Sequence, residues 1–138
     1  MRYLNTRIWM LIVGALSTLG ALVNIIAAET VAVDAWGNLA GRELDIAVGL
    51  EQLWGLWFIT SGVAILLLAL LTHGISQART GAVVIGLTFV GQFVAFSTLG
   101  SKGYLEESGA PIEQILPFAA IYLIGFIACV KGWNEKTK

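Results

Sequence analysis

Four apolar stretches without a charged side chain constrain this sequence more than any other feature. They run from Ile8 to Ala28, Leu53 to Leu71, Ala82 to Leu99 and Ile115 to Val130. About 20 residues at a rise of about 1.5 Å per residue span the roughly 30 Å hydrocarbon core of a bilayer, so each stretch approaches membrane length as a helix. Charged residues make up 12% of the chain, against about 25% in soluble domains. The sequence therefore predicts an integral membrane protein.

The predicted fold class is all-α. Lipid offers no hydrogen-bond partner to backbone N–H and C=O groups, which favours helices, and the stretches are too few to close a β-barrel. We expect a four-helix transmembrane bundle with helices at about residues 8–28, 53–71, 82–99 and 113–130. The length of 138 residues suits one domain over residues 1–138. The first stretch exceeds the roughly 7 to 15 residues of a signal-peptide core, so we expect it to be retained as a helix.

The distribution of charged residues orients the predicted bundle. Most basic residues lie before the first helix, between the second and third, and after the fourth: Arg2, Arg7, Arg79, Lys131, Lys136 and Lys138. Most acidic residues lie on the other side: Glu29, Asp34, Glu43, Asp45, Glu51, Glu106, Glu107 and Glu113. Because lysine and arginine bias loops towards the cytoplasm, we expect an N-in/C-in topology with both termini and the short loop 72–80 in the cytoplasm.

The outer segment between the first two helices, residues 29–49, is too long for a tight turn and too apolar for a flexible linker. We expect it to pack on the bundle as a structured loop, with a short interfacial helix that leads into the second transmembrane helix. The apolar residues of that short helix are Leu39, Leu44, Ile46 and Leu50. Further along the chain, Thr80 is the expected N-cap of the third helix.

Small residues recur along the first three predicted helices. They are Gly14, Thr18, Ala21, Gly55, Gly62, Gly81, Gly86, Gly91 and Ala95. In lipid the hydrophobic effect does not drive helices together, so close backbone approach and interhelical hydrogen bonds hold a bundle together. Helix packing is therefore the favoured interpretation of these residues, and a pore or a gap for a ligand is the alternative.

Polar side chains at membrane depth define the candidate ligand-binding site. The candidates are Asn24, Glu51, Thr60, Ser61, Gln92 and Glu113. Helical rise places Asn24 about 6 Å, and the Thr60, Ser61 and Gln92 side chains about 10 to 12 Å, below the outer ends of their helices. These side chains either line a polar cavity that opens outward or bond neighbouring helices, with the two acids facing water near helix N-termini. Glu51, an acid at the lipid boundary, is the strongest candidate for a ligand anchor or proton carrier.

Several kinds of chemistry lack their usual residues. His73 is the only histidine and Cys129 the only cysteine, so neither a histidine-based metal site nor an intramolecular disulfide is expected. The sequence has no glycine-rich phosphate-binding loop with its lysine. A net charge of −1 gives no basic excess that would attract nucleic acid. We therefore expect no catalytic residue, no metal and no cofactor, and a non-enzymatic role is favoured.

The second half of the chain resembles a group of small bacterial membrane proteins. The residues that carry the resemblance are the run from Glu51 to Phe58, EQLWGLWF, a short basic turn, and a glycine-bearing third helix that ends near Gly100. Over about Leu50 to Gly132 the chain resembles the four-helix DoxX-like and related uncharacterised families. Relatives often carry an arginine just after the acid and another late in the third helix, where this chain has Leu53 and the run 93–96. The resemblance implies the fold and a bacterial inner membrane location, but not a shared polar site or an activity.

Two functions are compatible with the sequence. The favoured one is a non-enzymatic accessory or scaffold component in the lipid bilayer, whose helices pack against a membrane protein partner or a further copy of the chain. The second is a binder or carrier of a small lipophilic or protonatable molecule in the outer-leaflet cavity. The second function requires the polar candidates to converge in space, whereas the first does not.

Overall fold

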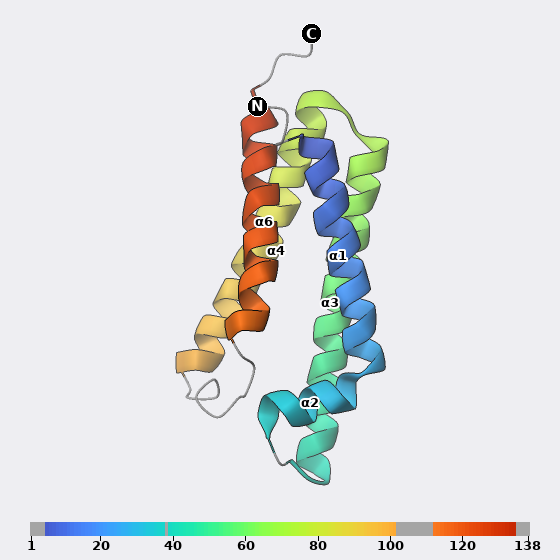
Figure 1. The fold of residues 1–138 in the computed structure, drawn as a ribbon, viewed down its shortest axis with the longest axis vertical. Coiled ribbons are helices and arrows are strands. Elements are labelled where there is room, and N and C mark those ends of the chain that lie inside the picture. The colour runs from blue at the N-terminus through green and yellow to red at the C-terminus, as the bar shows by residue number, and fades with distance from the viewer. Residues whose placement is uncertain (1–4, 38, 102–111, 135–138) are drawn as a thin grey trace.

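The computed structural model describes residues 5–37, 39–101 and 112–134. Within these ranges the chain is all-helical, as predicted, with five helices and no strand. The helices are α1 (Thr6–Ile26), α2 (Ala28–Trp36), α3 (Arg42–Leu71), α4 (Gly74–Ser101) and α6 (Ile112–Gly132). Figure 1 shows that α1, α3, α4 and α6 run lengthwise, whereas the short α2 lies across the end where α1 stops.

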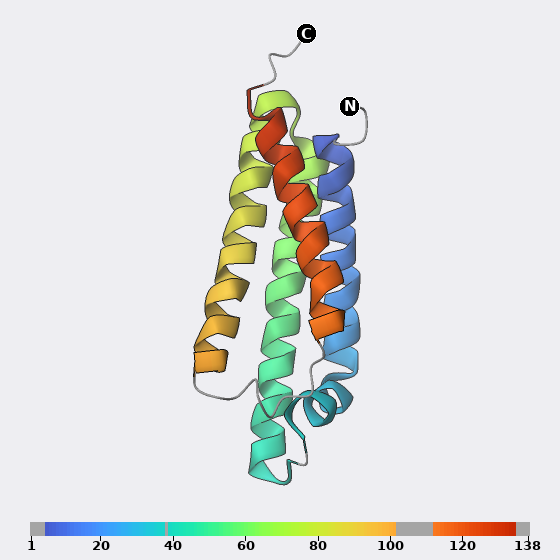
Figure 2. The same cartoon turned by 60° about the vertical axis from the view of Figure 1, so that its left-hand side comes forward.

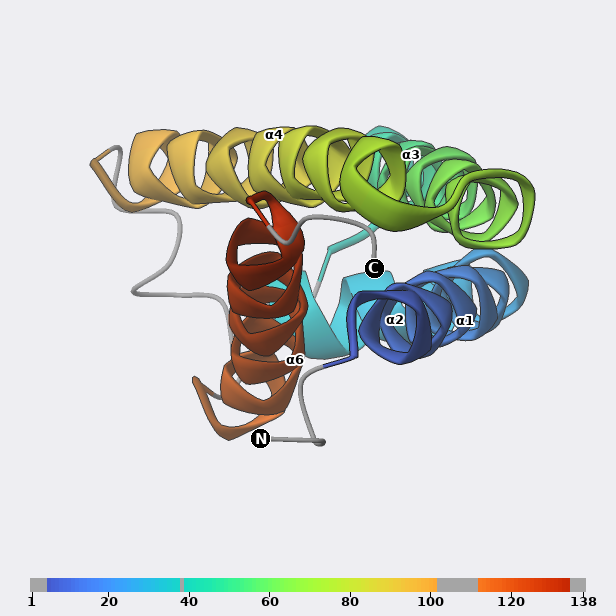
Figure 3. The same ribbon diagram turned by 90° about the horizontal axis from the view of Figure 1, so that it is seen from above.

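The long helices pack mainly in two pairs, α1 with α3 and α4 with α6 (Figure 3). The Thr6 hydroxyl, at the start of α1, donates to the Ala128 carbonyl oxygen near the end of α6 at 3.1 Å. The turn between α3 and α4 lies at the same end of the molecule (Figures 1 and 2), which we call the turn end. In both views α3 and α4 diverge, so that the gap between their axes widens with distance from this turn.

Three helical segments are long and apolar enough to cross a membrane: Thr6–Ile26, Arg42–Leu71 and Gly74–Ala95. Within α6, Leu116–Gly132 is a shorter apolar helix. The surface of these helices is itself apolar, since Leu19, Leu53 and Leu87 are 60%, 63% and 66% exposed. Water-soluble proteins rarely expose large contiguous apolar areas. The predicted membrane character is therefore supported by both the length and the surface of the helices.

The buried core is small and lies where all four long helices approach one another. Its largest fully buried side chains are Met10, Val13, Ile65, Ile85 and Cys129. Two polar side chains of the core, Ser17 and Tyr122, form a hydrogen bond with each other, and their hydroxyl oxygens are 2.6 Å apart. The Ser17 hydroxyl also donates to the Val13 carbonyl oxygen at 2.6 Å. This pair joins α1 to α6 without leaving an unpaired polar group in the core.

Small residues bring α1 and α3 into backbone contact. A methyl group added to Gly62 would lie 2.5 Å from the Thr18 hydroxyl oxygen and 2.9 Å from the Gly14 carbonyl oxygen. A methyl group on Gly14 would lie 2.9 Å from the Gly62 carbonyl oxygen. All three distances are too short for carbon in van der Waals contact, so neither position accepts a larger residue without movement of the backbone. The packing interpretation of these small residues is confirmed at this contact.

The segment between the first two long helices is structured, as expected, but its helices differ from those expected. The expected short helix at residues 39–50 is not separate from the second long helix: α3 is continuous from Arg42, which follows Gly41 at a positive φ of 57°. The separate short helix is instead α2, in residues expected to form a loop. A charge-free apolar stretch indicates only the apolar part of a helix. The first turn of α3 carries the charged residues Glu43 and Asp45 and therefore lies outside that stretch. The start expected at residue 53 was therefore too late.

The expected N-cap at Thr80 is wrong, because α4 begins at Gly74. Gly74 has a positive φ of 59°, which lets the chain reverse within two residues, 72–73. The Gln77 side-chain amide closes the turn by donating to the carbonyl oxygens of Ala69, at 2.9 Å, and Thr72, at 2.7 Å. The Thr80 hydroxyl donates to the Ser76 carbonyl oxygen within the same helix at 2.8 Å. The polar residues 72–80 were expected to form a loop, but they include the first turns of α4.

Candidate functional site

Glu51 is held by side chains from two other helices. The Asn24 amide nitrogen, near the end of α1, donates to the Glu51 Oε2 at 3.1 Å and to the Glu51 backbone oxygen at 2.9 Å. The Trp36 indole nitrogen, at the end of α2, donates to the Glu51 Oε1 at 3.0 Å. Each carboxylate oxygen therefore accepts one hydrogen bond. We call these three residues the Glu51 clasp.

The Glu51 clasp fixes the short helix α2 to the rest of the fold. It joins α1, α2 and α3, which are consecutive along the chain but run in different directions (Figure 1). Hydrogen bonds from neutral donors to a carboxylate are stronger than those between neutral groups. Asn24 thus bonds a neighbouring helix, which is one of the two roles expected for it. The Trp36 contact was not predicted from the sequence.

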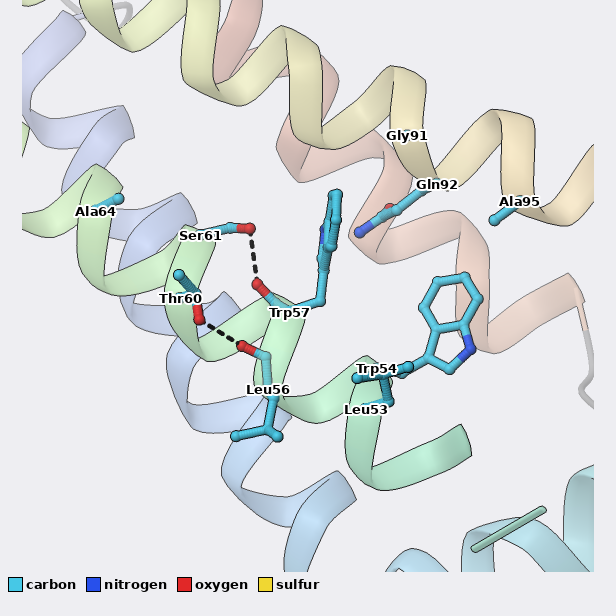
Figure 4. A pocket seen from close by; sticks show the side chains of 10 residues that line it. All are labelled: Leu53, Trp54, Leu56, Trp57, Thr60, Ser61, Ala64, Gly91, Gln92 and Ala95. Carbon is cyan, nitrogen blue, oxygen red and sulfur yellow. Dashed lines mark hydrogen bonds between the residues drawn. The ribbon is translucent and has the colours of Figure 1, made fainter. Parts of the chain in front are cut away.

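A second feature is a groove between α3 and α4 with a volume of about 630 Å³. This volume falls within the roughly 300 to 1,000 Å³ typical of small-molecule sites. The groove lies where α4 leaves α3 after the tight turn (Figures 1 and 2). Ten residues line it: Leu53, Trp54, Leu56, Trp57, Thr60, Ser61, Ala64, Gly91, Gln92 and Ala95. Figure 4 shows that the two indoles project from α3 towards α4, where small residues leave room for them.

Trp57 reaches α4 because Gly91 has no side chain. A methyl group on Gly91 would lie 3.3 Å from the Trp57 ring, so any larger residue there would press on the indole. Trp54 stacks with Phe58 on the same helix, with ring centroids 6.5 Å apart. Neither tryptophan was among the predicted site residues, but the structure makes both of them walls of the groove. Their spacing of three residues places both on one face of α3, and this is the signal that could have indicated a shared surface.

Thr60 and Ser61 line the groove but use their hydroxyl protons within α3. The Thr60 hydroxyl donates to the Leu56 carbonyl oxygen, and the Ser61 hydroxyl donates to the Trp57 carbonyl oxygen, both at 2.8 Å (Figure 4). Such bonds to the preceding turn are common for these residues in apolar surroundings. Towards the groove, each hydroxyl oxygen therefore retains lone pairs only.

Gln92 differs from the other polar residues of the groove. Its amide nitrogen Nε2 is buried and has no hydrogen-bond partner among the described residues. Figure 4 shows the amide pointing from α4 towards the indole of Trp57. An unpaired buried donor costs about 1–3 kcal/mol, so such groups are rare in native structures. Among the described polar atoms that line the groove, the Gln92 Nε2 is thus the buried one without a hydrogen-bond partner.

The six predicted site residues do not form a single cavity. Asn24 and Glu51 belong to the Glu51 clasp, whereas Thr60, Ser61 and Gln92 lie in the groove. Thr60 follows Glu51 by nine residues, which at about 100° per residue puts them on roughly opposite faces of α3. Glu113 lies in α6, and its side chain is outside the described residues.

Comparisons with protein-family models, curated proteins and solved structures found no match for this chain. Within the described ranges, no group of three or more His, Cys, Asp or Glu side chains could hold a metal ion. The functional argument therefore rests on the Glu51 clasp and on the groove between α3 and α4.

Proposed function

We propose that this chain crosses the membrane four times, with both ends in the cytoplasm, and binds a lipophilic molecule in the groove between α3 and α4. The single observation that carries the binding proposal is the Gln92 amide, a buried donor without a partner in an otherwise apolar groove. Binding sites combine an apolar lining with a few placed polar groups, and this groove has that composition. Because the outer faces of α3 and α4 are apolar, the molecule would enter sideways from the bilayer.

The distribution of charge supports the proposed topology. Arg7, Arg79 and Lys131 lie towards the turn end, where Arg79 sits 5.7 Å from the centre of the Trp133 ring. The described acids of α2 and α3 lie towards the opposite end: Glu29, Asp34, Glu43, Asp45 and Glu51. This asymmetry is the one that the positive-inside rule associates with a cytoplasmic turn end.

The fourth proposed crossing is helix α6. Its apolar part in the described structure is the shorter segment Leu116–Gly132. The whole of α6 has 21 residues, which corresponds to about 31 Å of helix. It packs against α4 and α1, so it has the length and the neighbours of a membrane-spanning helix. A four-helix bundle in a bacterial inner membrane, as the DoxX-like resemblance implies, is part of this proposal.

A role as an accessory or scaffold protein is the alternative. A partner helix would also fit against exposed apolar residues such as Leu87 and Phe93. Lipid covers such surfaces equally well, however, so exposure alone does not favour a partner. The unpaired Gln92 amide favours a small molecule with a polar atom, which hydrocarbon chains alone do not provide.

The test is to extract the protein with its surrounding lipid in polymer-bounded discs and to identify retained molecules by mass spectrometry. We expect one lipophilic molecule in near-stoichiometric amount. Ala95→Phe, which fills the groove, should remove it, whereas Val94→Phe on the exposed neighbouring position should retain it. Equal retention by the two variants would contradict the groove as the site, and a stoichiometric protein partner in place of the small molecule would favour the accessory role.

A further inference from the structure

We infer that the molecule bound in the groove is neutral, carries a hydrogen-bond acceptor such as a carbonyl oxygen, and is recognised by the Gln92 amide. This inference rests on the proposed function, because it specifies the ligand of the same groove. It depends on three properties of the lining: its charge, its hydrogen-bonding capacity and its length.

The charge of the lining selects a neutral ligand. All ten lining residues are uncharged. A charged group moved into such surroundings loses its hydration and gains no opposite charge in return. Fatty-acid carboxylates and amines are therefore poor candidates. A neutral ketone, ester or amide loses much less hydration free energy on entering the groove.

The hydrogen-bonding capacity of the lining selects an acceptor. Thr60 and Ser61 donate their hydroxyl protons to carbonyl oxygens of α3 and have only lone pairs left for a ligand. Gln92 retains both N–H groups, since its Nε2 has no partner. A ligand with an acceptor oxygen would pair this buried donor. A pure hydrocarbon would leave this donor unpaired.

The Gln92 side-chain amide must turn when the ligand binds in the groove. Nε2 is buried and points towards Trp57 (Figure 4). The terminal torsion of a glutamine side chain has a broad energy profile, so the amide can turn towards the groove without disturbing α4. From Leu53 to Ala64 the groove follows 12 residues of α3, a rise of about 16 Å. An acceptor at Gln92 can therefore be followed by an extended apolar chain.

The experiment uses two probes that differ only at the acceptor: 1-phenyldecan-1-one and decylbenzene, in which CH2 replaces the ketone. The wild-type protein in lipid nanodiscs carries ¹⁵N in its glutamine side chains, and Gln92→Leu assigns the Gln92 amide among Gln52, Gln77, Gln92 and Gln114. We expect the ketone, but not the hydrocarbon, to shift the Gln92 amide resonances. The shift is measured in the wild-type protein, and the variant serves only to identify the Gln92 resonance.

Calorimetric titration gives the matching affinities, with empty nanodiscs as the blank. Gln92→Leu should weaken ketone binding about tenfold, the effect of one lost hydrogen bond, and leave decylbenzene unchanged. Gln52→Leu, at an exposed position of α3, should affect neither probe. If both probes bind equally to wild type and to Gln92→Leu, the acceptor inference is wrong while the groove function stands. If neither probe binds the wild-type protein above the blank, both are wrong.

Discussion

Replacing Gly62 by alanine will destabilise the protein by about 2–3 kcal/mol, although alanine normally favours a helix over glycine. The added methyl group would lie 2.8 Å from the Thr18 backbone nitrogen and 2.9 Å from the Gly14 carbonyl oxygen. Backbone atoms cannot turn aside as a side chain can, so α1 and α3 must separate. The measurement is reversible unfolding in mixed micelles with increasing SDS, followed by circular dichroism.

Gly49→Ala is the matched control for this substitution. Gly49 lies on the same helix, and a methyl group there would meet nothing within 4 Å. Alanine at this position should stabilise α3 by up to about 1 kcal/mol through helix propensity alone. If Gly62→Ala and Gly49→Ala shift the unfolding midpoint equally, the close contact between α1 and α3 is not what holds these helices together.

Replacing Glu51 by alanine will cost about 2–3 kcal/mol and will release α2 from the other helices. The change leaves the Trp36 indole without its acceptor at 3.0 Å and removes the 3.1 Å bond from Asn24. Part-buried donors left unpaired cost about 1–3 kcal/mol each. Amide hydrogen exchange measured by mass spectrometry should show faster exchange in α2, residues Ala28–Trp36.

Two variants separate this effect from a general loss of negative charge. Glu51→Gln keeps one acceptor oxygen and should lose about half as much stability as Glu51→Ala. Glu43→Ala removes an exposed acid from the first turn of α3 and should cost less than about 1 kcal/mol. Unchanged exchange in α2 when Glu51 is alanine would show that the clasp does not hold this helix.

The fold class follows from the sequence because the bilayer restricts the possible structures so strongly. A charge-free stretch such as Leu53–Leu71 has no stable conformation in lipid other than a helix. The ends of the helices were harder to predict. Arg42 begins α3 eleven residues before Leu53, since helical turns in water or at the interface lack an apolar signal. The early start of α4 depends on Gln77, which reaches back to carbonyl oxygens of the preceding helix.

The candidate site was only partly predictable. Polarity at membrane depth singled out Asn24, Glu51 and Gln92 as candidates, but a linear sequence does not say which helix faces meet. Glu51 and Thr60 were grouped by depth, and the helical rotation between them places them on roughly opposite faces. Trp57 was not among the predicted site residues, because only polar side chains were taken as candidates. Its role depends on Gly91 in another helix.

The central claim is that the helices cross a membrane and that the turn end faces the cytoplasm. It is tested most directly by single cysteines in a Cys129→Ala background, labelled on intact cells with a membrane-impermeant maleimide. Gly49→Cys, at an exposed position near the start of α3, and Ser76→Cys, at an exposed position of the turn end, are the two reporters. We expect Gly49→Cys to be labelled on intact cells and Ser76→Cys only after the membrane is opened. Labelling of Ser76→Cys on intact cells would contradict the claim.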